Sequence, residues 1–191
     1  TLNSSANILN KGFFTNNGTF NNTGRVEGSV IANNGTGTIV DTDNGINCEV
    51  SKHGNASTYR LILTNASEDD IVNAVNNNSI DVIEVNNDIM IECDINNNSE
   101  IIFNGNTTIC DNGSIVNNGK IAFNGQLTID GTLNNNGNSE IIICKDSVAT
   151  ESSSFVNSGT INLEGIFDVF GNFNNNGIIS LNGGQLNNNN V

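Results

Sequence analysis

The chain has 191 residues and a formal net charge of −14, from 20 acidic and 6 basic residues. Such a charge argues against binding to nucleic acid or to anionic membranes, which are themselves negative. No apolar run reaches the roughly 18 residues of a membrane-spanning helix, so membrane insertion is not expected. Asparagine is the commonest residue, with 43 copies. This richness is typical of disorder, but here the apolar residues keep a strict phase, which favours an ordered fold.

Hexads that end in glycine open the chain. Residues 7–24 read NILNKG, FFTNNG and TFNNTG. A short, exact period of this kind indicates a stacked repeat. The pattern loosens towards residue 45. We therefore expect residues 1–45 to form solenoid coils, which either stack on the rest of this chain or are donated to a neighbouring subunit.

The segment 46–76 interrupts the hexads, and we expect a loop followed by a short capping helix. Residues 46–64 predict a strand and a loop, and they contain the only histidine, His53, which we expect to be exposed and away from any nucleophile. Residues 65–76, NASEDDIVNAVN, predict the helix. Ser67 can cap it, and Asp70 completes a pattern similar to a capping box. The predicted buried stripe is Ile71, Val72 and Val75.

Residues 77–191 predict the main solenoid. Strand-like segments (DVIEV, DIMIEC) precede the hexads SIVNNG, KIAFNG, QLTIDG and TLNNNG, and a second series follows at 154–183. The second and fourth positions point the same way on a strand, and both are mostly apolar. The Asn-Gly that ends many hexads tolerates the positive φ of a tight corner. Each hexad therefore predicts one strand and one corner, and three hexads make one coil of roughly 18–20 residues.

Asparagine recurs at the fourth hexad position once in each predicted coil. Asparagines one coil apart would stack, and stacked amides can hydrogen-bond to one another. An inward amide left unpaired would cost about 1–3 kcal/mol. The sequence therefore predicts a structural ladder inside the solenoid, made of Asn117, Asn135, Asn157 and Asn175.

The cysteines and the acidic residues leave alternatives open. None of the four cysteines is in a CxxC pair, so a zinc site is not expected. They are either unpaired packing thiols or, in an extracellular protein, disulfides within or between subunits. The acidic residues between 68 and 100 are either a solvated face or ligands for a divalent cation such as Ca²⁺, which takes oxygen ligands. We expect no cofactor otherwise. The cysteines are Cys48, Cys93, Cys110 and Cys144.

The short helix followed by DVIEVNNDIMIECDI resembles the opening of the right-handed parallel β-helix proteins of the pectin-lyase-like superfamily. The later hexads are similar to the Asn-Gly repeats of filamentous-haemagglutinin-type surface adhesins. This resemblance implies an all-β, right-handed parallel β-solenoid with one short helix. In such proteins a helix often caps one end, but here solenoid-like sequence also precedes the helix, so residues 46–76 are either such a cap or an excursion from one stack of coils. The resemblance also implies, as one option, cleavage of polysaccharides.

We expect a non-enzymatic structural protein: a subunit of a self-assembling surface fibre or sheath, or an adhesin. Open solenoid ends are strand edges that pair with other chains, which favours a homopolymer stacked head to tail. A chain that starts at Thr1 fits a processed, secreted protein as well as an excised segment, and we expect an extracellular, cell-surface location. The partners would be further copies and a glycan or another cell-surface ligand.

Two alternatives remain. The first is a glycan-binding module, although tryptophan is absent and one tyrosine is present, so stacking platforms for sugars are scarce. The second is a polysaccharide-cleaving enzyme similar to pectin lyases. A hydrolase needs two positioned carboxylates, and the pairs Asp41/Asp43 and Glu92/Asp94 have same-face spacing on a strand. Such pairs are also common on acidic solenoid faces.

Overall fold

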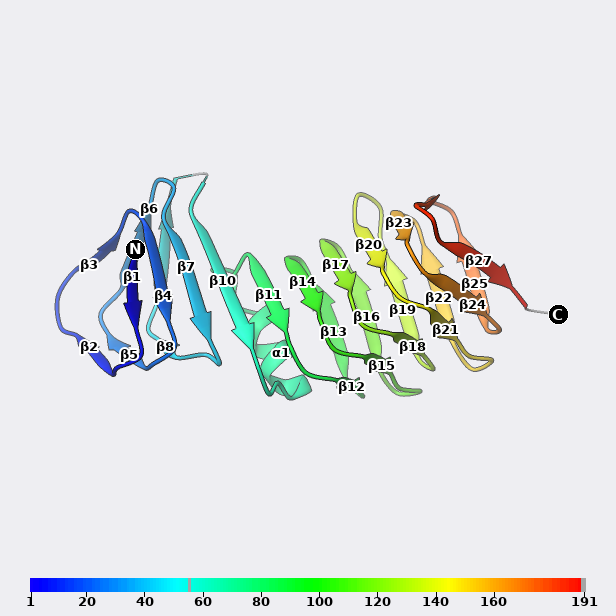
Figure 1. The fold of residues 1–191 in the computed structure, drawn as a ribbon, viewed down its shortest axis with the longest axis horizontal. Helices are drawn as coiled ribbons and strands as arrows, with labels where there is room; N and C mark the ends of the chain where they lie inside the picture. The colour runs from blue at the N-terminus through cyan, green and yellow to red at the C-terminus, as the bar shows by residue number, and fades with distance from the viewer. Residues whose placement is uncertain (55, 190–191) are drawn as a thin grey trace.

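The computed structural model describes residues 1–54 and 56–189, and it shows a parallel β-solenoid. The coils stack along the long axis, with the N-terminus at one end and the C-terminus at the other (Figure 1). One face runs the whole length as a ten-stranded parallel sheet, called sheet A here. Its strands are β1 (Leu2–Ser4), β4 (Thr19–Asn22), β7 (Thr38–Thr42), β10 (Thr58–Leu63), β11 (Val82–Val85), β14 (Glu100–Phe103), β17 (Lys120–Phe123), β20 (Glu140–Ile143), β23 (Thr160–Leu163) and β26 (Ile178–Leu181).

The second face consists of two separate sheets, B near the N-terminus and D near the C-terminus. Sheet B contains β2 (Ile8–Asn10), β5 (Val26–Gly28) and β8 (Ile46–Asn47). Sheet D contains β12 (Ile89–Ile91), β15 (Thr107–Ile109), β18 (Leu127–Ile129), β21 (Ser147–Ala149), β24 (Ile166–Val169) and β27 (Gln185–Asn188).

The third face is divided in the same way into sheets C and E. Sheet C contains β3 (Phe14–Asn16), β6 (Ile31–Asn34) and β9 (Val50–His53). Sheet E contains β13 (Asp94–Asn97), β16 (Ser114–Asn117), β19 (Thr132–Asn135), β22 (Ser154–Asn157) and β25 (Asn172–Asn175).

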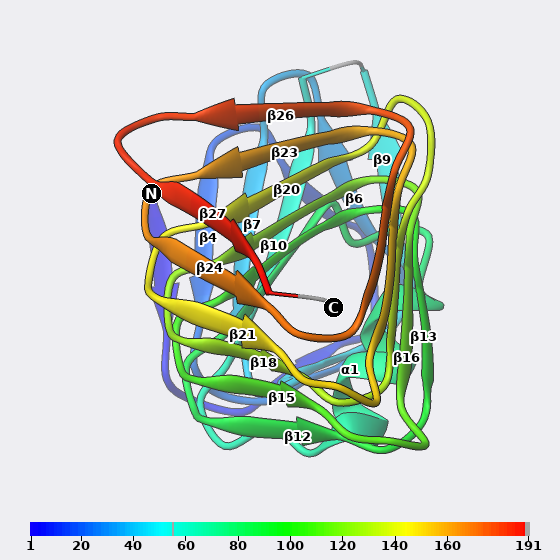
Figure 2. The same ribbon diagram turned by 90° about the vertical axis from the view of Figure 1, so that its right-hand side faces the viewer.

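Each coil visits the three faces in the same order, and the parallel registers fix its length. Val82 pairs with Glu100, and Glu100 pairs with Lys120, so successive coils advance by 18 and 20 residues. In Figure 2 the C-terminal end faces the viewer, and the chain runs counter-clockwise as it approaches. The solenoid is therefore right-handed, as expected for parallel crossover connections.

The hexads form strands because their alternate residues fill the interior. Ile115 and Asn117 of β16 are buried, whereas Ser114 and Val116 between them are only partly covered. One hydrophobic cluster contains core residues from the first coils to the last. Inside it Phe103 stacks on Phe123, with ring centroids 5.3 Å apart. The prediction that second and fourth hexad positions point inward is confirmed.

The hexad glycines have a different role from the one expected. We predicted corners that need positive φ, but the glycines at 113–177 do not adopt it. Most of them are needed for space instead, and Gly137 is an exception, because nothing lies within 4 Å of a Cβ built on it. A Cβ on Gly131 would overlap the carbonyl oxygens of Cys110 and Gly113 in the coil below, so a side chain there would force the coils apart.

The helix α1 (Glu68–Val75) forms where the sequence predicts it. Ser67 caps it, and Ser67 with Asp70 makes a complete capping box. The residues that it buries are Ile71, Ala74 and Val75, so Ala74 takes the place expected for Val72, which is only partly buried.

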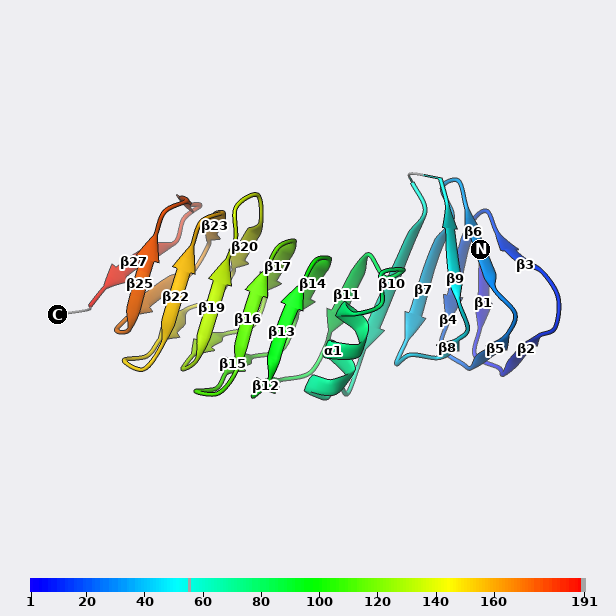
Figure 3. The same cartoon turned by 180° about the vertical axis from the view of Figure 1, so that it is seen from behind.

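The position of this helix corrects the expectation of an end cap. It lies in the middle of the stack, between β10 and β11, where it replaces the second and third faces of one coil (Figures 1 and 3). It contacts β11, β12 and β13. The segment 46–63, expected to be a loop with one strand, instead supplies the strands β8, β9 and β10. The first coils stack on the rest of this chain through β7, β10 and β11.

Candidate functional site

A ladder of buried asparagines runs up the inside of sheet E. Each side-chain amide nitrogen donates to the side-chain oxygen of the asparagine one coil further on. The four residues singled out in the sequence lie in this ladder, and Asn97, which sequence reasoning missed, begins it. The N···O distances are 2.8 Å for Asn97–Asn117, 2.9 Å for Asn117–Asn135, 2.7 Å for Asn135–Asn157 and 2.7 Å for Asn157–Asn175.

Each inner amide of the ladder also bonds to the backbone of the next coil. Nδ2 of Asn135 donates to the carbonyl of Thr160 at 3.0 Å, and its Oδ1 accepts from Oγ of Ser139 at 2.7 Å. The buried polar groups of these inner asparagines are therefore satisfied, as is usual in a low-dielectric interior. The last residue differs, because Asn175 is exposed and its Nδ2 donates to the carbonyl of Gly177 in its own corner, at 3.3 Å.

The N-terminal coils contain two shorter ladders. Asn16 donates to Asn33 at 2.8 Å on sheet C. On sheet A, Asn22 donates to Asp41 at 2.7 Å, and Tyr59 donates to the same carboxyl from the next coil at 3.2 Å. The backbone N–H of Ile46 is a third donor to Asp41, at 3.0 Å.

Asp41 is thus a fully buried carboxyl group surrounded by donors. Its exposed fraction is 0%. Burial raises its pKa above the ordinary value, although the hydrogen bond from Asn22 acts in the opposite direction. Asp41 therefore cannot act with Asp43 on a substrate. Asp43 lies in an exposed turn and accepts from Thr64, so the predicted same-face pair is wrong.

The other predicted carboxylate pair is also separated by a corner. Strand β12 ends at Ile91 and β13 begins at Asp94, so Glu92 and Asp94 border two different faces of the coil. A further side-chain pair was missed in the sequence. Oγ of Ser51 lies 3.0 Å from Nε2 of exposed His53, two residues along the same strand, where we had expected no nucleophile near the histidine.

The first and last coils expose side chains that would be interior in any other coil. Leu2 of β1 is in register with buried Phe20 and yet is 47% exposed. At the other end, Leu181, which is in register with buried Leu163, is 57% exposed, and Ile179, which is in register with buried Ile161, is only partly buried. Both ends of the described structure are therefore open parallel edges with apolar surface.

The four cysteines are all free and partly buried, and none of them forms a disulfide in the described part of the chain. Burial is the main cause that raises the pKa of each thiol, with nearby carboxylates second. The thiols are therefore protonated at neutral pH and weak as nucleophiles or metal ligands. They are Cys48, Cys93, Cys110 and Cys144.

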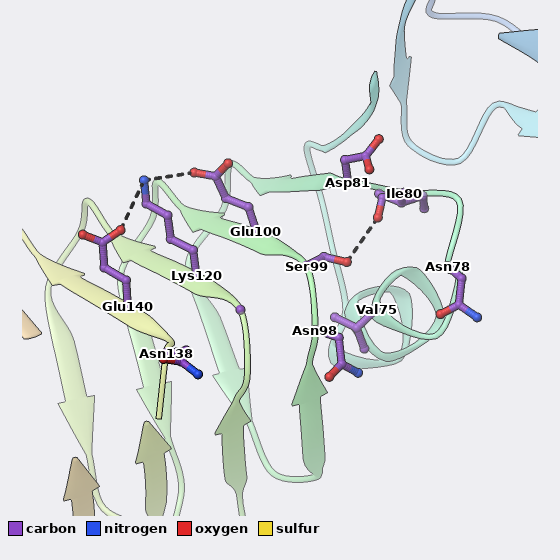
Figure 4. Close-up of a pocket in the computed structure, with 11 residues that line it drawn as sticks. Val75, Asn78, Ile80, Asp81, Asn98, Ser99, Glu100, Lys120, Asn138 and Glu140 are labelled. Atoms are coloured by element: carbon purple, nitrogen blue, oxygen red, sulfur yellow. Dashed lines mark hydrogen bonds and ion pairs between the residues drawn. The ribbon is translucent and has the colours of Figure 1, made fainter. Parts of the chain in front are cut away.

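A polar pocket of about 580 Å³ lies between the outer surface of sheet A and the helix (Figure 4). On its strand side Lys120 bridges Glu100 and Glu140, with Nζ···O distances of 3.5 and 3.6 Å. The amides of Asn98 and Asn138 also line it. Carboxylates, an ammonium group and amides in one pocket can hydrogen-bond to a ligand rich in hydroxyl groups.

Within residues 1–54 and 56–189, the structure brings no three His, Cys, Asp or Glu side chains together in a metal-binding arrangement. No helix in the described part of the chain is long and apolar enough to span a membrane. No protein-family model, curated protein or solved structure matches this chain.

Proposed function

We propose that this chain is a non-enzymatic structural protein of the cell surface, a subunit of a fibre or sheath, or part of an adhesin. Its role is to provide a rigid rod whose coils continue into those of another copy. The outer faces would carry the contacts with a glycan or another cell-surface ligand.

The observation that carries this proposal is the pair of open edges. Interior coils bury their inward side chains almost completely, whereas Leu2 and Leu181 at the two ends remain about half exposed. An exposed parallel edge pairs readily with another strand, and apolar surface favours covering it. A second copy supplies a matching edge of the same architecture.

We also propose kinship with the surface adhesins built from Asn-Gly hexads on a pectin-lyase-like β-helix. The right-handed coil and the internal asparagine ladder support this kinship. The non-enzymatic part of the proposal is supported by Asp41, because a carboxyl group held by three donors in the core is committed to structure.

Negative-stain electron microscopy of the purified chain at increasing concentration tests the proposal. We expect unbranched filaments as wide as one solenoid. They should survive reductant, because all four cysteines lie in interior coils rather than in the terminal ones. Discrete single rods at the highest concentration would overturn self-assembly.

A second candidate function is glycan binding in the polar pocket, favoured by the row of Glu100, Lys120 and Glu140. A glycan array tests it, with Lys120→Ala as the variant expected to lose binding. Lys145, which lines a different pocket, supplies the matched control Lys145→Ala. Equal binding by both variants and the parent would contradict this use of the pocket.

A further inference from the structure

The order in which the strands follow one another around the coil determines how a second copy can dock. In the C-terminal half the chain passes from sheet E to sheet A to sheet D and then returns to E. The last three strands are β25 on E, β26 on A and β27 on D. The next place on the spiral after β27 is therefore above β25, on the E face.

We infer that two copies join head to tail with an offset of one face, so that β1 of the incoming copy lies on β25. This inference rests on the proposed function. Strands β2 and β3 then cover β26 and β27 in order, and the spiral passes from one copy to the next as it does within one chain. Sheet A of one copy thereby continues sheet E of the other.

The alternative, in which like faces are stacked, leaves a gap. If β1 lay on β26, the following strand β2 would lie on β27. The strand β3 would then reach the E face two strand spacings above β25, and the place directly above β25 would stay empty. The backbone groups on its open side and the half-buried ring of Phe173 would then have a neighbouring strand only at β22. The offset arrangement covers all three terminal strands.

The inward side chains also fit the offset arrangement. In register, Leu2 faces Phe173 and Ser4 faces Asn175. Nδ2 of Asn175 donates to the carbonyl of Gly177 in its own corner. The hydroxyl of Ser4 donates to the carbonyl of Ala6, so its oxygen can still accept a hydrogen bond. The hydroxyl of Ser4 thus accepts the bond that each earlier asparagine gives to the next coil.

Two of the remaining inward pairs of this interface are apolar, and a third places Asn16 opposite Asn188. Ile8 of β2 faces Ile179, and Phe14 of β3 faces Leu186. All four side chains are partly buried against the core already, so stacking extends the existing interior without a new kind of contact. One pair is mismatched, because Asn10 faces Leu181.

Cysteine cross-linking distinguishes the two arrangements. Outward residues opposite each other on neighbouring strands lie about 4.8 Å apart, within the range that a disulfide bridges. In a chain whose four native cysteines are replaced by serine, Asn3→Cys with Asn174→Cys reports the offset contact. Asn3→Cys with Ser180→Cys reports the like-face contact and is the matched control.

We expect oxidised Asn3→Cys/Asn174→Cys protein to form a ladder of covalent oligomers on a denaturing gel, and Asn3→Cys/Ser180→Cys protein to remain monomeric. The reverse result would overturn the offset, as would filaments in which neither pair links. Microscopy of the same samples separates these outcomes from failure of the proposed function, in which no filaments form at all.

Discussion

The coils before and after the helix hydrogen-bond their inward polar side chains in two different ways. In the C-terminal half, one asparagine in each coil donates to the next, and the chain of amides runs unbroken from Asn97 to Asn175. In the N-terminal half, the ladders of sheets A and C are short, and the ladder of sheet A ends at Asp41. Both halves stack in parallel register on the same sheet A.

This difference shows what an internal amide ladder requires. An asparagine both donates and accepts, so it can continue a ladder, as Asn117 does, or end one by donating to backbone carbonyls, as Asn33 does. An ionised aspartate has no donor, and it can therefore end a ladder where donors approach from both sides. Asn22 donates to Asp41 from one side and Tyr59 from the other. The last polar residue at an inward position thus determines which partners a ladder ends on.

The sharpest way to break the C-terminal pattern is Asn135→Ala in the middle of its ladder. It removes the acceptor of one N–H of Asn117 Nδ2, whose other bond to the Glu140 carbonyl remains, and it removes the donor to Oδ1 of Asn157. Each orphaned group costs about 1–3 kcal/mol, so we expect a loss of about 2–6 kcal/mol in the free energy of unfolding, measured in urea. Outward Asn136→Ala, which removes an exposed bond to Asn118, is the control and should change stability by about 0.5 kcal/mol or less.

Gly131→Ala tests whether the spacing of the coils depends on glycine. The new Cβ would overlap two carbonyl oxygens of the coil below, and we expect a loss of about 2 kcal/mol or more in thermal or urea unfolding. Gly137, one hexad later, has nothing within 4 Å of a built Cβ. Gly137→Ala should therefore be neutral or stabilise by about 0.4–1 kcal/mol. Equal effects at the two positions would contradict the spatial role.

Asp41→Asn would turn the end of the N-terminal ladder into a continuing amide. Its NH₂ group would meet the N–H of Ile46 or the Asn22 amide, so one donor would lose its acceptor. We expect a loss of about 1–3 kcal/mol in the free energy of unfolding. Asp43→Asn, in the exposed turn, is the control and should change stability by about 0.5 kcal/mol or less.

The difference in stability between the parent and Asp41→Asn should depend on pH. Burial raises the pKa of Asp41 in the folded chain above its ordinary value of 3.8. At a pH between these two pKa values, the folded chain keeps a proton that the unfolded chain releases. The stability that this proton contributes is fully present below the pKa of the unfolded state, and it is lost as the pH rises through the raised pKa of the folded state. The stability advantage of the parent over Asp41→Asn should therefore shrink as the pH rises from below 3.8. An advantage that grows would contradict the raised pKa.

The smallest change in stability is expected at helix α1, which lies between the N-terminal and the C-terminal coils. Ser67→Ala removes the cap of α1, which should cost about 1 kcal/mol. Hydrogen bonds from the Ser67 backbone and side chain lower the pKa of Asp70 below 3.8. That contribution is present above the unfolded pKa and is lost as the pH falls. NMR titration should show the Asp70 pKa rising towards its ordinary value in the variant, and an unchanged pKa would contradict the capping box.

The hexads made much of the fold predictable. The spacing of the glycines marks the corners, and the apolar positions mark which side of each strand faces inward. Ile115 and Asn117 illustrate this. The coil at 46–63 was not predictable in the same way, since its strands carry no glycine period. Asn97 was missed for a similar reason, because the segment before it lacks the hexad glycine that marks the phase.

The features of the candidate site depend on contacts between coils that spacing alone does not show. Asp41 and Asp43 alternate correctly for one face, yet the turn at Asp43 takes φ of 52° and sends the second carboxyl group elsewhere. The place of the helix inside the stack also depends on which neighbours cover Ile71, and local sequence cannot give this.

The interruption by the helix has a mechanical consequence. Ten strands of sheet A form one continuous path of backbone hydrogen bonds along the axis, whereas the other two faces stop at β8 and β9 and resume at β12 and β13. Tension along the rod is therefore carried through the junction mainly by the pairing of β10 with β11. We expect bending to concentrate there, with sheet A as the spine and the helix side as the side that opens.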